Sequence, residues 1–130
     1  MSTSQTDSSS VRDVAVIGGG MAGAPLAAAL ARHGLDVAVL DSRPWQASVP
    51  SGVPERASAL NAGTRTLLKR LGIWQHLPPS PSIRDIEVTT GDRPGRATLH
   101  PQASEADPFG HVVENAALVS AAWQRLEEQD

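Results

Sequence analysis

Apolar residues lie in short runs of different spacing, and these runs predict alternating strands and helices. Asp13–Ile17 (DVAVI) is rich in β-branched residues and predicts a buried parallel strand. Met21–His33 predicts a helix ended by Gly34, and Asp36–Leu40 predicts a second strand. The first part of the chain is therefore expected to form a βαβ unit.

The segment Pro54–Leu77 predicts one amphipathic helix. Asn61 is expected to cap its N-terminus, and Gly72 is expected just after its last residue. The predicted apolar face consists of Leu60, Leu67, Leu68 and Leu71. Ahead of this helix, Ser42–Pro54 contains three prolines and is expected to be a loop packed around Trp45.

The C-terminal half predicts a hairpin followed by a helix. Ile83–Thr90 alternates in polarity as a strand with a slip in the alternation, and Arg96–His100 is expected to pair back on it. His111–Val113 predicts a short extended piece, after which Asn115 is expected to cap a helix over Ala116–Glu128. The apolar stripe of this last helix would consist of Leu118, Val119, Ala122, Trp123 and Leu126.

The turn between the first strand and the first helix carries the most specific pattern. Gly18, Gly20 and Gly23 fall at the spacing G-x-G-x-x-G. Gly18 would allow a sharp turn, Gly20 would let a pyrophosphate approach the backbone, and Gly23 would let the helix lie close to the strand. Asp41 ends the second strand near the offset of roughly 20 residues at which an acid binds a ribose hydroxyl. The combination predicts a dinucleotide with its diphosphate at the N-terminus of the helix.

Two other interpretations of this stretch remain open. The glycines could form a purely structural turn in a doubly wound sheet, with Asp41 an ordinary carboxylate at a strand end. The uncharged run Val14–Ala31 could instead cross a membrane, although three consecutive glycines and Pro25 weaken a helix there. A secretory signal is not favoured, because Arg12 is the one basic residue ahead of the apolar stretch.

Composition narrows the class of protein. The 130 residues are enough for one domain, and the net charge of −3 does not favour nucleic acid as a partner. The absence of cysteine excludes disulfides and thiolate chemistry, and the four histidines lack metal-ligand spacing, so we predict no metal ligand. Residues 1–11 predict a disordered leader and residues 12–130 a partial nucleotide-binding domain. Without a signal segment, cytoplasmic localisation is expected.

Three separated stretches resemble one protein family. They are VIGGGMAGAPLAAAL with Asp41, ERASALNAGTRTLLKRLGIW, and GHVVENAALVSAAWQRL. Together they are similar to the N-terminal third of flavin-dependent aromatic hydroxylases, and most of all to the branch that hydroxylates polyprenylated phenols in ubiquinone biosynthesis. The resemblance covers residues 12–128 and implies FAD as cofactor, NAD(P)H as reductant, O₂ as co-substrate and a small aromatic substrate. The sequence shows no triad-like constellation, which agrees with the cofactor chemistry implied by the resemblance, in which no side chain is catalytic.

The resemblance also implies a set of residues that bind FAD. The residues at the pyrophosphate would be Gly18, Gly20, Met21, Ala22 and Gly23. Asp41 and Ser42 would lie at the adenosine ribose, and Arg56 would reach the phosphates and ribityl chain. Asn115 would lie near the flavin. Without the resemblance, Arg56 reads as a surface arginine and Asn115 as a helix cap.

Members of the family are much longer and carry two later motifs that complete the flavin and substrate sites. We therefore expect a truncated α/β domain, in which a Rossmann-like FAD-binding βαβ unit is joined to a short antiparallel hairpin. It should bind FAD weakly, lack hydroxylase activity alone and be prone to self-association at its sheet edge. The alternatives are an inactive remnant, a small NAD(H)-binding module, or an FAD-dependent oxidoreductase of another reaction type.

Overall fold

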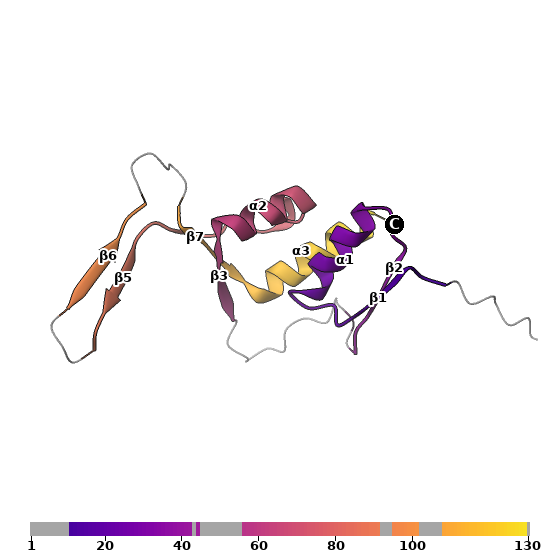
Figure 1. Cartoon of the computed structure of the whole chain (residues 1–130), viewed down its shortest axis with the longest axis horizontal. Helices are drawn as coiled ribbons and strands as arrows, with labels where there is room; N and C mark the ends of the chain where they lie inside the picture. The colour runs from indigo at the N-terminus through magenta and orange to yellow at the C-terminus, as the bar shows by residue number, and fades with distance from the viewer. Residues whose placement is uncertain (1–10, 43, 45–55, 92–94, 102–107, 130) are drawn as a thin grey trace, which may run out of the picture.

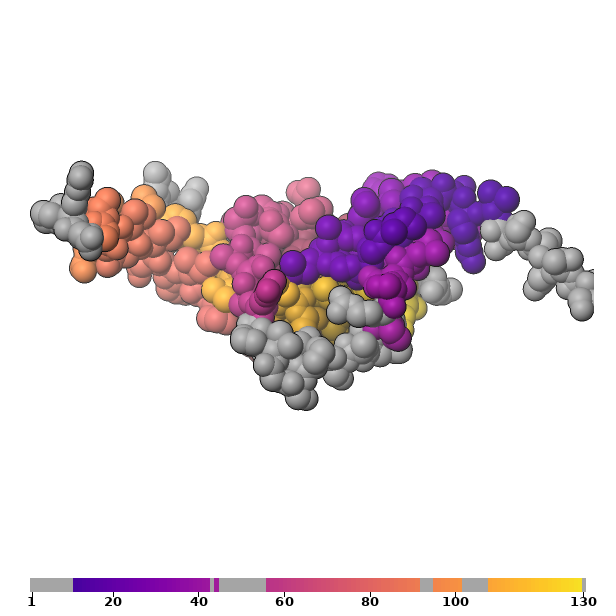
Figure 2. Space-filling model, turned by 90° about the horizontal axis from the view of Figure 1, so that it is seen from below, coloured from indigo at the N-terminus to yellow at the C-terminus, as the bar shows by residue number. Residues whose placement is uncertain are grey.

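The computed structural model of the protein describes residues 11–42, 44, 56–91, 95–101 and 108–129. Within these residues the helices gather at the centre, with a parallel strand pair at one end and a hairpin projecting from the other (Figure 1). The space-filling view shows the same elongated outline, with the hairpin in orange far from the indigo N-terminal strands (Figure 2). The predicted leader over residues 1–10, Trp45 and most of the Ser42–Pro54 loop lie outside the described residues.

The bounds of the elements follow in chain order. They are β1 (Val14–Ile17), α1 (Gly23–Arg32), β2 (Val37–Leu40), β3 (Ala57–Asn61), α2 (Ala62–Leu71), the 3₁₀ turn η1 (Trp74–His76), β4 (Ser82–Ile83), β5 (Ile86–Thr89), β6 (Arg96–Leu99), β7 (Gly110–Glu114) and α3 (Asn115–Glu127).

The predicted βαβ unit is confirmed. β1 and β2 pair in parallel, from Val14 opposite Val37 to Ile17 opposite Leu40, and α1 connects them. α1 is shorter than predicted because residues 21–22 form a turn before it. The alanines at 24, 27 and 28 are buried, and such small side chains let α1 lie close to its neighbours.

A three-stranded antiparallel sheet was not predicted. β7 is its central strand and pairs with β3 along one edge and with β4 along the other. Leu60 therefore lies in β3 and not on the α2 face, so its predicted placement was wrong, although it is buried. The strand escaped prediction because alanine and serine, which make up most of Ala57–Leu60, have weak strand propensity.

The predicted strand Ile83–Thr90 is two strands that belong to different sheets. β4 pairs with β7, whereas β5 pairs with β6 in an antiparallel hairpin. The slip in the polar alternation marks the break at residues 84–85 between them. The hairpin itself is confirmed, and it extends away from the helices (Figure 1).

The core forms where the three helices meet the sheet of β3, β7 and β4. Its buried residues are Ala24, Ala28, Leu60, Leu68, Leu71, Ile73, Val113, Leu118, Ala121 and Ala122. Trp74, Leu77, Trp123 and Leu126 pack against this cluster. Leu67 is 55% exposed, so its predicted place on the buried face of α2 was wrong.

The two predicted helix caps had different outcomes. The side chain of Asn61 accepts a hydrogen bond from the N–H of Thr64 at 2.8 Å, which confirms the cap of α2. Asn115 does not cap α3, because Glu114 holds that position and Asn115 is already helical. The Asn115 N–H donates to the carbonyl of Arg56 at 2.8 Å. The first residue of α3 is therefore hydrogen-bonded to the residue that precedes β3.

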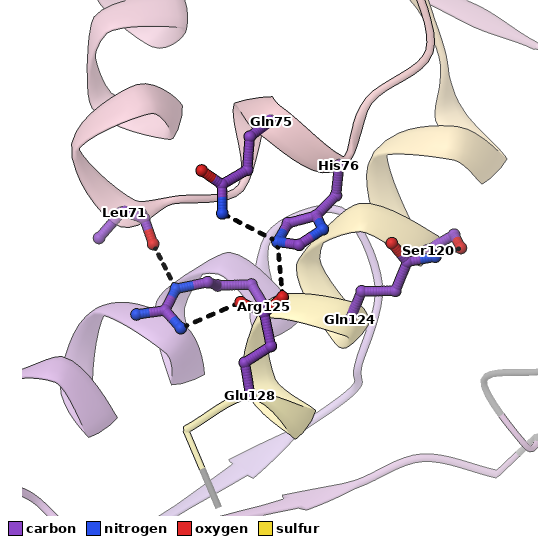
Figure 3. Close-up of polar contacts among 7 residues, drawn as sticks. All are labelled: Leu71, Gln75, His76, Ser120, Gln124, Arg125 and Glu128. Carbon is purple, nitrogen blue, oxygen red and sulfur yellow. Dashed lines mark hydrogen bonds and ion pairs between the residues drawn. The ribbon is translucent and has the colours of Figure 1, made fainter.

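Gly72 ends α2 as predicted and brings its C-terminus to α3. Its φ of +77° is left-handed, and the N–H of Ile73 donates to the carbonyl of Leu68 at 2.9 Å, as in a Schellman motif. Arg125 Nε donates to the carbonyl of Leu71 at 2.9 Å, and Glu128 contacts both Arg125 and His76 (Figure 3). These contacts join the ends of α2 and α3.

No helix among the described residues is long and apolar enough to cross a membrane. The membrane interpretation of Val14–Ala31 was wrong, because this stretch is divided between β1, a glycine turn and α1.

Candidate functional site

The glycine turn leaves β1 with the backbone geometry that the sequence predicts. Gly18 has a φ of +97°, a left-handed conformation in which other residues are strained. Its N–H donates to the carbonyl of Leu40 at 2.7 Å, so the turn begins while the chain still pairs with β2. The predicted role of Gly18 in the sharp turn is confirmed.

Gly23 and Gly20 have opposite surroundings. A Cβ at Gly23 would overlap the carbonyl of Gly18 and lie 3.3 Å from Cγ1 of Val16, which confirms the close approach of α1 to β1. A Cβ at Gly20 would meet no atom of the described residues within 4 Å. The space that a ligand needs beside the backbone of Gly20 is therefore present.

Backbone donors face this turn at the start of α1. Within the described part of the chain, the N–H groups of Gly20, Met21, Ala22 and Gly23 donate to no acceptor. Gly20, Met21 and Ala22 are also exposed to solvent. Unpaired amides and the positive end of the helix dipole together favour an anion at this position.

Asp41 brings a carboxylate to the same turn from the end of β2. Its Oδ2 accepts a hydrogen bond from the N–H of Gly19 at 2.8 Å, and Ser42 follows it on the surface. A carboxylate has about four acceptor sites, so a bond to one backbone N–H does not prevent it from accepting further hydrogen bonds. The structure thus places Asp41 and the three patterned glycines at the same ends of β1 and β2.

Trp123, in α3, contacts the glycine turn, and the sequence analysis did not predict this contact. Its indole Nε1 donates to the carbonyl of Gly19 at 2.9 Å, and Gly19 is buried beneath it. The pattern predicted only that Trp123 belongs to an apolar stripe, and 104 positions separate it from Gly19 along the chain. No local signal could have paired the two residues.

Arg56 and Asn115 form a second group at the junction of β3, β7 and α3. They are joined through the backbone, and the side chain of Arg56 is exposed. The Asn115 Oδ1 accepts a hydrogen bond from Oγ of Ser58 at 2.7 Å, so Ser58 is a further polar residue that the sequence did not indicate. α3 connects this group to the glycine turn, because Asn115 begins the helix and Trp123 lies about 12 Å along it.

The sequence analysis assigned no histidine to a metal site. Among residues 11–42, 44, 56–91, 95–101 and 108–129, no group of three or more metal-ligating side chains is found. The candidate site therefore consists of backbone donors, one carboxylate, one arginine and one amide. Such a set can bind and orient an anionic nucleotide.

The sequence matches one family model and is similar to several curated proteins. A family model described as "FAD binding domain" matches residues 12–119. Ubiquinone hydroxylase UbiL of Rhodospirillum rubrum is 39% identical over 118 residues, which cover 89% of this chain and 27% of UbiL. The 3-demethoxyubiquinol 3-hydroxylase of Escherichia coli is 33% identical over 117 residues, which cover 88% of this chain and 30% of that enzyme.

The fold is also similar to that of a solved structure. A variant of 2-methyl-3-hydroxypyridine-5-carboxylic acid oxygenase superposes with a TM-score of 0.67 and 20% identity, over 93% of this chain and 30% of that chain. This likeness confirms the α/β class with its Rossmann-like unit. The chain spans less than a third of the length of the curated relatives named above.

Proposed function

The chain belongs to the FAD binding domain family, and from that premise we propose that it is the FAD-binding portion of a flavin-dependent monooxygenase acting on an aromatic ring. The observation that carries the proposal is the glycine turn, where open space at Gly20 adjoins unpaired amides and the Asp41 carboxylate. The names of the two curated relatives support hydroxylation of a ubiquinone-type, polyprenyl phenol-like substrate. NAD(P)H and O₂ as the other reactants rest on the family resemblance of the sequence.

Each part of FAD is assigned a group of residues in this proposal. The pyrophosphate would accept hydrogen bonds from the N–H groups of Gly20, Met21, Ala22 and Gly23, in the space that Gly18 and Gly20 leave open. This assignment is supported by the fit between a doubly charged anion and a helix N-terminus.

The remaining assignments concern the two ends of the cofactor. Asp41 would accept hydrogen bonds from the adenosine ribose, with Ser42 beside it, because Asp41 ends β2 at the turn. Arg56 would bind the phosphates and ribityl chain, for which a forked guanidinium is suited. Asn115 would lie toward the flavin, and the length of α3 between Asn115 and Trp123 suits a cofactor that extends from the turn along the helix.

The side chains assigned here position a cofactor and do not perform the reaction. Bound FAD, reduced by NAD(P)H, supplies the oxygen chemistry. The residues of this chain would bind its diphosphate, orient its ribose and hold the extended molecule along α3. We accordingly propose that residues 12–130 form a partial domain that binds FAD weakly and does not hydroxylate alone.

A ligand series tests this function. The purified chain is titrated with FAD, ADP, FMN and NADH, using ligand-observed NMR because that method detects weak binding. We expect FAD to bind and ADP to displace it, while FMN, which keeps one phosphate but lacks the adenosine monophosphate half, does not compete. If FMN binds as tightly as FAD, or if the folded chain binds neither FAD nor ADP, the proposal fails. Binding of NADH in clear preference to FAD would instead support a small NAD(H)-binding module.

We further propose cytoplasmic residence and self-association. The leader supports the first proposal, because it carries little positive charge before the apolar stretch. Exposed apolar residues at the β1–β2 pair, Ile17 at 79% and Leu40 at 53%, support the second. Size-exclusion chromatography with light scattering at several concentrations tests the self-association.

A further inference from the structure

We propose that Trp123 is a positioning residue for the nucleotide, which it serves by fixing the orientation of the peptide unit between Gly19 and Gly20. This inference deepens the proposed function and rests on it. Trp123 is not expected to touch the reacting atoms; it acts through the backbone of the glycine turn.

Both sides of Gly19 are held by side chains from distant parts of the chain. The N–H of Gly19 donates to Asp41 Oδ2 at 2.8 Å, and its carbonyl accepts from Trp123 Nε1 at 2.9 Å. Gly19 is therefore fixed at its amide by the end of β2 and at its carbonyl by α3.

The bond from Trp123 determines where the next N–H points. In a trans peptide unit the carbonyl of one residue and the N–H of the following residue point in opposite directions, and no cis peptide bond occurs among the described residues. Since the Gly19 carbonyl points at the indole, the N–H of Gly20 points away from it. That N–H donates to no acceptor in the described part of the chain and adjoins open space, which is the arrangement that a phosphate oxygen requires.

The indole also explains why position 19 is glycine. G-x-G-x-x-G leaves that position unspecified, and the φ of Gly19 is not in the left-handed region. A Cβ at Gly19 would nevertheless overlap Cζ2 of Trp123 and lie 3.1 Å from Cε2. Gly19 and Trp123 are thus complementary in size.

Three consecutive glycines give the turn a large conformational freedom that a ligand would otherwise have to restrict. The hydrogen bond from Trp123 raises the share of molecules in which the Gly20 N–H already faces the ligand. When this share falls, the apparent affinity falls in the same proportion. Loss of one typical hydrogen bond changes such an equilibrium constant by about fivefold, so the oriented share and the affinity fall by up to about fivefold.

The test compares Trp123→Phe with Trp74→Phe as a matched control. Trp74 also packs against the core, but its ring lies edge-on to His111 at 5.3 Å and not at the turn. We expect Trp123→Phe to weaken FAD binding by up to about fivefold and to speed hydrogen exchange of the Gly19 amide by about fivefold. Trp74→Phe should leave the FAD affinity and the exchange rate of the Gly19 amide unchanged, even if it lowers the melting temperature as much as Trp123→Phe does.

A purely structural role for Trp123 would lower stability without changing affinity or Gly19 exchange below the melting transition, and that result would overturn the proposal. If neither the wild-type chain nor the variant binds FAD, the proposed function fails. The exchange of the Gly19 amide then decides alone whether Trp123 orients the turn.

A second comparison guards against a variant that does not fold. Benzothienylalanine at position 123 keeps the bicyclic shape and replaces the N–H by sulfur, so it should weaken FAD binding as Trp123→Phe does. Gly19→Ala should reduce affinity strongly beside Trp123 and less in the Trp123→Phe background, because the smaller ring leaves room for the methyl group. Equal losses in the two backgrounds would contradict the pairing of these residues.

Discussion

A methyl group added at Gly20 should lower FAD affinity, whereas the same methyl group added at Gly23 should lower the stability of the fold. Gly20→Ala places the methyl group where no atom of the residues given in the structure lies within 4 Å, and the φ of Gly20 is not left-handed. Its stability should therefore change by less than about 1 kcal/mol, with a gain possible from the lower entropy of the unfolded chain. If a pyrophosphate occupies that space, the methyl group blocks it, and FAD affinity should fall by about tenfold or more, roughly 1.4 kcal/mol.

Gly23→Ala, unlike Gly20→Ala, should lower the free energy of unfolding. Its methyl group would overlap the carbonyl of Gly18 and crowd Val16, so α1 must move away from β1. Overpacking of this kind costs about 1–3 kcal/mol, which for a chain of this size lowers Tm by roughly 4–12 °C.

Thermal unfolding followed by circular dichroism and a titration with FAD below both melting transitions measure the two quantities. Gly34→Ala, which lies outside the site and is destabilised by left-handed strain at a φ of +80°, serves as the control: it should lower Tm and leave FAD affinity unchanged. The reasoning is refuted if Gly20→Ala binds FAD as tightly as the wild-type chain, or if Gly23→Ala melts at the wild-type temperature.

Three further substitutions test the site and the helix contacts. Asp41→Asn keeps an oxygen acceptor for the Gly19 N–H but loses the charge, so FAD affinity measured by titration should fall about tenfold with little change in Tm. Arg125→Met removes the donor to the Leu71 carbonyl, and because its side chain is only 23% exposed, urea unfolding should show a loss of about 1–2 kcal/mol. Asn61→Ala should cost about 1 kcal/mol through loss of the α2 cap, whereas Asn61→Asp should retain most of it; equal losses would contradict the cap.

Much of the fold followed from local sequence signals. The strand Asp13–Ile17, the helix ended by Gly34 and the β5–β6 hairpin were predicted close to their observed bounds. These elements have strong period or turn signals that act within a few residues. Ala57–Asn61 has neither a strong period nor a turn signal, and it forms a strand because it pairs with β7.

The candidate site divides in the same way. The left-handed turn at Gly18 and the close approach at Gly23 could be predicted from spacing, because each depends on backbone sterics near the glycine itself. The role of Asn115 could not, since a cap and a hydrogen bond to Ser58 are equally compatible with its place in the sequence. Only the pairing of β3 with β7 brings Ser58 to it.

The βαβ unit, the backbone of its glycine turn and the acid that follows β2 could all be predicted from local sequence, because torsional freedom and the order of adjacent elements are properties of neighbouring residues. The return of α3 to the turn and the hydrogen bond from Trp123 to Gly19 are visible only in the folded chain. A hydrogen bond between residues so distant in the chain depends on how α1 and α3 pack, and packing selects among many partners that local patterns leave equivalent.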